Sequence, residues 1–481
     1  MPRRLTFADQ FQRAEQLLLQ NSFDEALQLV ETLDHRIKLD EEEQVKCKLL
    51  KSQILAKKGI EEADLDRASD YLQQSMELKE ELGDHSGLIS VLGHIGSIAL
   101  NKGYEMQATK SFQRMITICQ DFDNQERLAW VLNMIGNIYG NFGVSDQALE
   151  YFQRSFSIFR DLDKKLGIAY SLTCLGWIYL LKGELERALS YLHQSEAIHE
   201  EINEPGYAAW AFVDLAIIYR AKGDLEKTFE YATKGYALGK EARNAVATAW
   251  TLYLLTIWAL DRSQYDSAES YSRQLQIFCS KTYPAHSQRR KNSREARLIG
   301  QLSLLAEGRL LKASPRLLDK MQAQDLFQQV AEDEPTFFGI ISDAMFNWCE
   351  LLLFELSVTR EWDVFREAKT LVQQFVVRAH QQHFLSSVVD ALIVQAKLAL
   401  VEGDLMAAEE FLDQAKTAAE EKGLSRLIKK AAIEKQRLQD QQVTWQALIQ
   451  TNAPFEDRLA QAQLREYLKE ALRIVYMSGN H

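Results

Sequence analysis

Residues 167–204 read GIAYSLTCLGWIYLLKGELERALSYLHQSEAIHEEINE and contain the pattern from which the fold can be predicted. Gly176 is followed by Tyr179, then by Gly183, and finally by Ala188. Apolar residues recur every three or four positions on both sides of Gly183, which predicts two helices joined by a left-handed turn at that glycine. The small side chains at 176 and 188 predict a close crossing of the two helices, since a larger side chain would push their axes apart.

The same four positions recur along the chain at a constant offset of 40 residues. They hold Gly96–Ala99–Gly103–Ala108, Gly136–Tyr139–Gly143–Ala148 and Ala216–Tyr219–Gly223–Thr228. A fixed period of this size is typical of an α-solenoid, in which each helix pair packs mainly on its neighbours. The sequence therefore predicts an all-α fold, a solenoid of antiparallel helix pairs.

Departures from this period predict five parts along the chain. The pattern lapses after residue 280 and returns as Ala396–Ala399–Gly403–Ala408. The expected parts are degenerate N-terminal repeats (1–84), regular 40-residue repeats (85–280), irregular helical pairs (281–387), one regular repeat (388–423) and C-terminal capping helices (424–481). Such a cap would give the last repeat a polar outer face.

The composition indicates a cytoplasmic protein that does not bind nucleic acid. The 481 residues carry a formal charge of −12, which would repel phosphates over most of the surface. No run of about 18 apolar residues is present, and the N-terminus lacks the apolar core of a signal peptide, so we expect no membrane span. The cysteines are odd in number and show no Cys-x-x-Cys motif, which predicts reduced thiols at Cys47, Cys119, Cys174, Cys279 and Cys349.

The repeating frame resembles the tetratricopeptide repeat. The Leu-Gly pair, aromatic residue, glycine and alanine of that family are present as Leu175–Gly176–Tyr179–Gly183–Ala188. The period is longer than the common one of about 34 residues, and it is similar to that of a long-repeat branch that includes kinesin light chains and bacterial peptide-sensing regulators. Residues from about 300 to 475 also resemble an archaeal family of repeat proteins without an assigned activity. The resemblance implies a right-handed superhelix in which the first helix of each pair lines a concave groove.

In this family, a few positions of the first helix face the groove and contact a peptide or helix of a partner protein. Carried onto this chain, they predict partner-binding residues at Trp130, Asn133, Asn137, Asn141, Asn101, Tyr170, Thr173, Trp177, Trp210, Trp250 and Tyr253. The four aromatic residues that lie 40 apart would form a stripe along the groove and anchor a ligand: Trp130, Tyr170, Trp210 and Trp250. The alternative is that these rings pack in the core between helices.

Three asparagines strengthen the prediction of a peptide ligand. Asn133, Asn137 and Asn141 lie at i, i+4 and i+8, hence on one face of a helix. An amide both donates and accepts hydrogen bonds, which suits the main chain of an extended peptide. The alternative is an ordinary solvated helix face.

Two further clusters have simpler explanations. The basic segment 281–297 could bind an acidic partner or RNA, or it could form the basic start of a long helix after the break in the period. His380 and His383 could share a metal ion, but no third ligand follows at a recognisable spacing, so no metal is expected.

The sequence contains no catalytic motif, neither a phosphate-binding glycine loop nor a nucleophile or zinc motif, so we expect neither an enzyme nor a cofactor. The leading interpretation is an interaction scaffold or adaptor with a protein or peptide partner. The alternatives are a regulatory receptor for a small peptide or metabolite, and a scaffold that associates with itself.

Overall fold

The computed structural model describes a chain that folds into α-helices. The described residues are 7–19, 22–34, 41–61, 65–101, 104–121, 124–141, 144–182, 184–203, 205–282, 294–333, 338–359, 361–381, 385–421 and 425–463. Over these ranges the chain forms 23 α-helices and no strand. The predicted all-α fold is confirmed.

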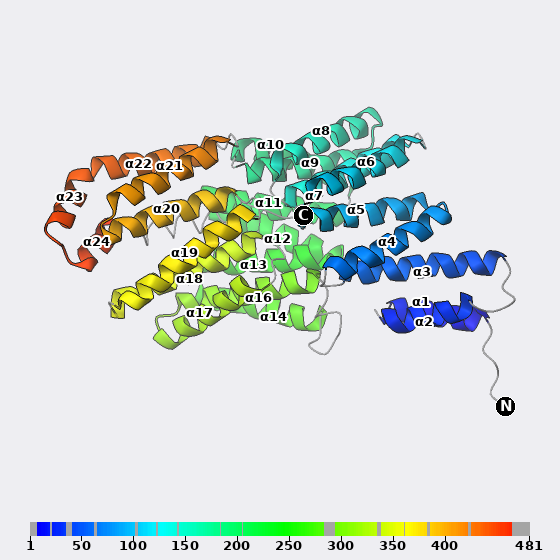
Figure 1. Ribbon diagram of the computed structural model, residues 1–481, viewed down its shortest axis with the longest axis horizontal. Helices are drawn as coiled ribbons and strands as arrows, with labels where there is room; N and C mark the ends of the chain where they lie inside the picture. Colours follow the sequence, from blue (N-terminus) through cyan, green and yellow to red (C-terminus); the bar gives the residue numbers. More distant parts are fainter. Residues whose placement is uncertain are drawn as a thin grey trace.

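The helices follow one another in antiparallel pairs (Figure 1). Seven pairs precede residue 283, namely α1 (Phe7–Leu19) with α2 (Phe23–Asp34), α3 (Glu41–Glu61) with α4 (Leu65–Glu81), α5 (His85–Asn101) with α6 (Glu105–Asp121), α7 (Gln125–Asn141) with α8 (Ser145–Asp161), α9 (Lys165–Leu181) with α10 (Leu185–Ile202), α11 (Pro205–Lys222) with α12 (Leu225–Glu241), and α13 (Ala245–Asp261) with α14 (Tyr265–Thr282). Three pairs follow, namely α16 (Arg294–Ala313) with α17 (Leu317–Glu332), α18 (Phe338–Thr359) with α19 (Trp362–Gln381), and α20 (Leu385–Glu402) with α21 (Leu405–Glu421). The last described helices are α22 (Ser425–Asp440), α23 (Gln442–Gln450) and α24 (Phe455–Gln461). Helices pack mainly on the elements next to them in sequence, as the predicted solenoid requires.

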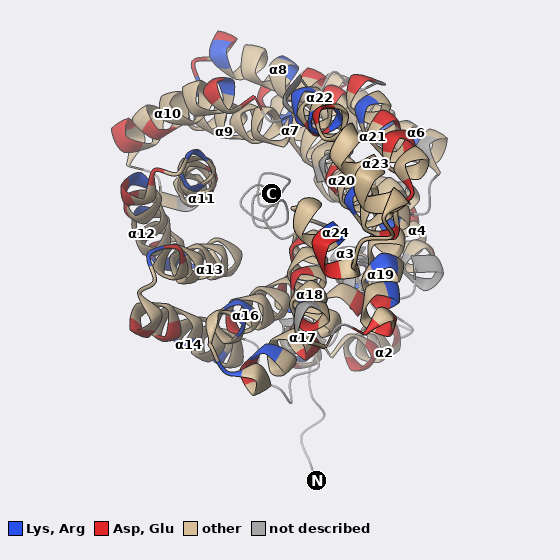
Figure 2. Ribbon diagram, turned by 90° about the vertical axis from the view of Figure 1, so that its left-hand side faces the viewer, with Lys and Arg blue, Asp and Glu red and all other residues tan. Residues whose placement is uncertain are grey.

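The pairs form two layers, which Figure 2 shows end on. The first helices of successive pairs, including α9, α11, α13 and α16, form an inner layer, and α10, α12 and α14 form the outer layer. Inner helices also contact the inner helices of the next pair, as α9 does with α11 and α11 with α13. We call the side of these helices that faces the central axis the inner face.

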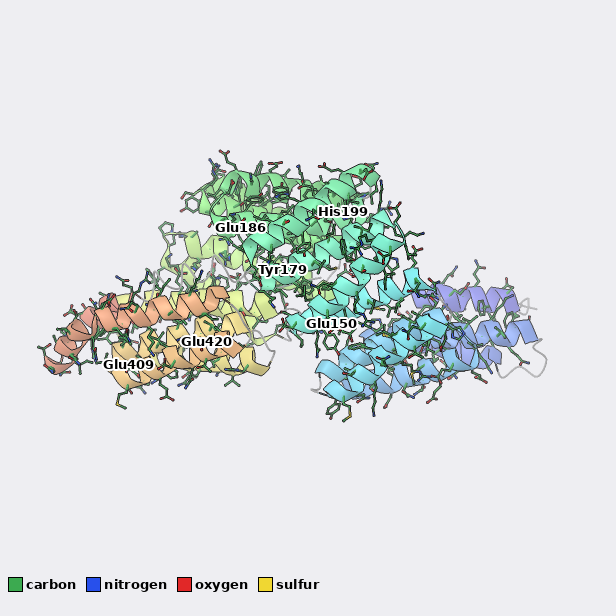
Figure 3. All side chains as sticks on the ribbon, turned by 90° about the horizontal axis from the view of Figure 1, so that it is seen from above. Glu150, Tyr179, Glu186, His199, Glu409 and Glu420 are labelled. Carbon is green, nitrogen blue, oxygen red and sulfur yellow. The ribbon has the colours of Figure 1, made fainter. Side chains whose placement is uncertain are left out.

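The outer layer exposes acidic side chains. Figure 3 labels Glu150 on α8, Glu186 on α10, and Glu409 and Glu420 on α21, all of which are exposed. These residues contribute to the negative charge of the chain on its outer side.

Glycines explain why the repeat pattern recurs. Gly223 and Gly403 have φ of +81° and +89° at turns between paired helices, a left-handed conformation that glycine adopts without strain. Within the α9–α10 pair, a Cβ at Gly176 would lie 2.6 Å from Leu192 Cγ and 3.3 Å from the carbonyl oxygen of Ala188. The close crossing predicted for positions 176 and 188 is therefore confirmed.

This contact gives a prediction for stability. We expect Gly176→Ala to lower the free energy of unfolding by about 1–3 kcal/mol, because the added methyl overpacks the crossing. Gly300→Ala on α16 is the matched control, since a Cβ there meets nothing within 4 Å, and the gain in helix propensity should stabilise by about 0.5–1 kcal/mol. Urea unfolding followed by circular dichroism measures both variants. Equal effects of the two substitutions would contradict the close crossing.

The five predicted parts stay a prediction, because helix pairs continue on both sides of the first three boundaries. Much of the basic segment lies outside the described residues, which resume at Arg294, and so do residues 464–481 of the predicted cap. No helix in the described ranges has the length and apolarity that a bilayer span needs.

Candidate functional site

Three aromatic rings from successive inner helices meet in one cluster. Trp130 on α7 lies 5.4 Å from Tyr170 on α9 and 6.0 Å from Tyr207 on α11, measured between ring centroids. Tyr170 and Tyr207 lie edge to face at 4.8 Å. Trp130 and Tyr170 are half-buried, and 38% of Tyr207 is exposed. We call these three residues the inner aromatic cluster, and it offers a partner apolar area on rings that are already held in place.

Hydrogen bonds hold the middle ring of this cluster. Asn137 Nδ2 donates to the Tyr170 hydroxyl oxygen at 2.7 Å, and Cys174 Sγ donates to Asn137 Oδ1 at 3.6 Å. Burial raises the pKa of Tyr170 well above its ordinary value, and the bond from Asn137 opposes this shift. The phenol therefore stays neutral at physiological pH, and the Asn137 amide is already used within the protein.

The first residue of the predicted asparagine ladder lies in the core. Asn133 is fully buried, and its Nδ2 donates to Ser171 Oγ at 3.0 Å. Ser155 Oγ in turn donates to the carbonyl oxygen of Ala129 at 2.7 Å and lies 3.2 Å from Ser171 Oγ. Asn133 thus belongs to a buried network that joins α7, α8 and α9. The side chains of Asn101 and Asn141 lie outside the described residues.

The structure splits the predicted aromatic stripe. Trp130, Tyr170 and Trp210 are half-buried, whereas Trp250 is 2% exposed. Three other predicted positions are also buried in the core, namely Thr173, Trp177 and Tyr253. These four side chains are buried between helices, as the alternative of core packing predicts. A partner could contact them only if the helices moved. The partner-binding assignment of the whole set stays a prediction.

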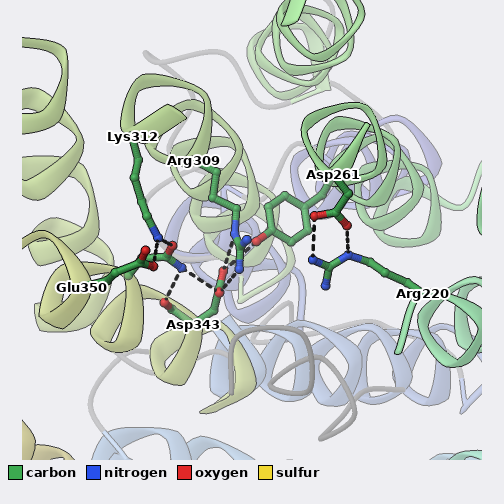
Figure 4. Close-up of polar contacts among 8 residues, drawn as sticks. Arg220, Asp261, Arg309, Lys312, Asp343 and Glu350 are labelled. Carbon is green, nitrogen blue, oxygen red and sulfur yellow. Dashed lines mark hydrogen bonds and ion pairs between the residues drawn. The ribbon is translucent and has the colours of Figure 1, made fainter. Parts of the chain in front are cut away.

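A second group of inner-helix residues is polar, and Figure 4 shows it. Asp343 on α18 is fully buried and accepts a hydrogen bond of 2.6 Å from the Tyr253 hydroxyl on α13. The same carboxylate pairs with the Arg309 guanidinium from α16 and accepts from Asn347 Nδ2 at 2.9 Å. Asp343 therefore joins three inner helices.

Two more ion pairs lie beside this group in Figure 4. Lys312 on α16 forms an ion pair with Glu350 on α18. Its ammonium also donates a hydrogen bond of 2.7 Å to Asn347 Oδ1 on the same helix. Burial lowers the pKa of Lys312, and the Glu350 carboxylate opposes the shift. Arg220 on α11 pairs with Asp261 on α13 at 2.8 Å. We call these eight residues the inner polar network: Arg220, Tyr253, Asp261, Arg309, Lys312, Asp343, Asn347 and Glu350.

Of the inner polar network, only Tyr253 is among the residues predicted from the sequence. One signal was available, because Arg220 and Asp261 are 41 positions apart, Arg309 and Asp343 34 apart, and Lys312 and Glu350 38 apart. Opposite charges that lie about one repeat apart, each on the first helix of a pair, could have been predicted to form ion pairs. The break in the period between 281 and 383 removed the common frame for two of the three pairs.

Among the described residues, no group of three or more His, Cys, Asp or Glu side chains comes together in a way that could hold a metal ion. His380 is exposed near the end of α19, and His383 lies outside the described residues.

Comparison with known proteins supports the repeat pattern. The family model described as tetratricopeptide repeat matches residues 127–201, which covers α7 to α10. No curated protein matches the chain. The long-repeat branch and the archaeal likeness stay predictions.

Several solved structures are similar at low identity. Aspartyl phosphate phosphatase F from Bacillus subtilis is 12% identical with a TM-score of 0.47, and the match covers 77% of this chain and 96% of that one. The Rap conjugation gene regulator of a plasmid, in complex with the Phr* peptide, is 13% identical with a TM-score of 0.46 over 78% and 97% of the two chains. The apo quorum sensor NprR from B. thuringiensis is 11% identical with a TM-score of 0.40 over 85% and 97%. The family match shows a tetratricopeptide-repeat segment at residues 127–201 of this all-α solenoid.

Proposed function

We propose that the chain is a protein-interaction scaffold that binds a peptide or helix of a partner protein on its inner face. The observation that carries the proposal is the inner aromatic cluster, in which Tyr207 is 38% exposed beside two half-buried rings. Buried aromatic anchors supply much of the binding energy at protein interfaces. Rings that are fixed before binding also lose little conformational entropy when a partner arrives.

The charge of the chain supports a protein rather than a nucleic acid as partner. The formal charge is −12, and acidic side chains are exposed on the outer layer. On the inner helices, the cations Arg220, Arg309 and Lys312 are each paired with a carboxylate. Phosphate binding would have to compete with these internal ion pairs.

The proposal includes no catalytic activity. It also places the protein in the cytoplasm, and the five buried free cysteines support that location because reduced thiols persist there. A receptor for a small peptide or metabolite, and self-association, remain the alternatives.

The test is selection of random peptides displayed on phage against the immobilised protein. We expect enriched sequences to bind wild type and to lose about tenfold or more in affinity with Tyr207→Ala, because the exposed ring of the cluster is removed. Tyr265→Ala is the matched control, since Tyr265 lies on the outer helix α14 with 51% of its surface exposed. Enriched peptides that lose equal affinity with both variants, or no enriched peptide at all, would contradict the proposal.

A further inference from the structure

A small cavity lies among the last described helices. Helices α20, α22, α23 and α24 gather at one end of the ribbon in Figure 1, in agreement with their contacts. The cavity that their side chains line measures about 30 Å³. On this measure a single water molecule needs about 10–15 Å³. The space therefore suits a ligand of only a few atoms and is too small for a peptide chain.

The charges around this cavity are unbalanced. The charged residues that line it are Lys397 on α20 and Glu434 and Arg437 on α22. Glu434 Oε2 lies 2.8 Å from Lys397 Nζ, and Glu434 Oε1 lies 2.5 Å from Arg437 Nη1. One carboxylate thus serves two cations, which leaves an excess of one positive charge in the lining.

The two cations differ in how far their donors are already used. The side chain of Lys397 is 10% exposed, and its ammonium also donates to the carbonyl oxygen of Ala462 at 3.1 Å. The side chain of Arg437 is 54% exposed. A guanidinium carries five N–H donors, of which Arg437 Nη1 supplies the bond to Glu434. Arg437 can therefore reach a ligand while it keeps its ion pair.

Trp445 on α23 adds an unused donor to the same lining. Its side chain is 1% exposed, and its buried indole Nε1 donates to no atom of the described residues. Buried N–H groups nearly always have a partner, because they lose their bonds to water on burial. An acceptor in the cavity would supply the missing hydrogen bond.

Part of the cavity wall is aliphatic. Its aliphatic residues include Ile393, Ala396, Leu400, Leu412 and Leu438. A ligand that fits this wall and the charged side together carries one negative charge, accepts hydrogen bonds and has a small apolar part.

We propose that this cavity binds a small monocarboxylate of about the size of acetate. The carboxylate accepts hydrogen bonds from the Arg437 guanidinium and the Trp445 indole, and its charge balances the excess cation. The methyl group packs on the aliphatic wall. The ligand would hold α20 against the capping helices α22 and α23 and stabilise this end of the solenoid. This site lies on other helices than the inner aromatic cluster and does not depend on the proposed function.

Nuclear magnetic resonance of the full-length protein with ¹⁵N-labelled tryptophan tests the proposal. The Trp445 indole signal is assigned by its loss in Trp445→Phe. We expect added sodium acetate to move this signal downfield to a plateau, because the N–H gains a charged acceptor. Arg437→Gln should weaken the affinity for acetate about tenfold or more, since the charge-assisted bonds are lost.

Arg366→Gln is the matched control for that variant. Arg366 on α19 also pairs with a carboxylate three positions before it, Asp363, but both side chains are exposed. Its substitution should leave the affinity for acetate unchanged. Acetate should also raise the Tm of wild type and of Arg366→Gln, but not of Arg437→Gln, because a ligand that binds only the folded state stabilises it.

Sodium chloride and sodium pivalate at the same ionic strength complete the experiment. Neither should move the Trp445 signal to a plateau, because chloride has no second atom to bridge the two donors and the tert-butyl group of pivalate exceeds the cavity. The proposal would be overturned by the lack of a plateau with acetate, by an equal shift with chloride or pivalate, or by unchanged acetate affinity in Arg437→Gln.

Discussion

Replacing Asp343 with alanine is expected to lower the free energy of unfolding by about 3–5 kcal/mol. The carboxylate is fully buried and pairs with Arg309, and it accepts hydrogen bonds from Tyr253 and Asn347. The substitution would leave the buried guanidinium without this carboxylate, and the desolvation of that charge would no longer be offset. The contacts between α13, α16 and α18 would weaken together. Urea unfolding followed by circular dichroism measures the effect.

A matched control separates burial from charge. Asp161→Ala also removes a carboxylate that pairs with an arginine, but Asp161 and Arg160 are 68% and 62% exposed in their side chains. An exposed ion pair contributes little, so we expect a change within about 0.5 kcal/mol. The loss in free energy of unfolding for Asp343→Asn should lie between those for Asp343→Ala and Asp161→Ala, because the amide oxygen still accepts hydrogen bonds while the charge is lost. Similar effects of Asp343→Ala and Asp161→Ala would show that the inner polar network does not stabilise the fold.

The helix pairs could be predicted because their determinants are local. A turn glycine such as Gly403 needs only its own φ, and the close crossing at Gly176 involves residues within one pair. Both signals recur with the period and so can be found from the sequence alone. The match of residues 127–201 to the tetratricopeptide repeat falls in the part where this period is regular.

The candidate site could be predicted only in part, because groove and core positions share one helical period. Asn133 and Asn137 are one turn apart on α7, yet the first is fully buried against Ser171 and the second is half-buried beside Tyr170. Which of them is accessible depends on how the next inner helix, α9, packs against α7. Tyr207 was missed for a related reason, since it lies three positions before the aromatic Trp210 of the 40-residue frame.

Trp177→Ala is the second substitution for which we expect a large loss, about 3–5 kcal/mol in the free energy of unfolding. Trp177 is fully buried, and its ring lies edge to face with Phe152 at 6.3 Å. A Cβ built at Gly140 on α7 would lie 2.5 Å from the ring atoms Cη2 and Cζ3 of Trp177. The indole therefore fills the space that the glycine leaves between α7 and α9, and its removal would open a cavity there.

A double-mutant cycle tests this contact directly. Gly140→Ala should cost about 1–3 kcal/mol in wild type, because the methyl meets the indole. In the Trp177→Ala background the same substitution should cost less, since the methyl enters the cavity, and the difference between the two costs measures the coupling. Urea unfolding of the four proteins gives all the terms. If Trp177→Ala changed stability by less than about 0.5 kcal/mol, as expected of a residue on an open surface, Trp177 would belong to the binding surface, as the tetratricopeptide frame predicts, and not to the core.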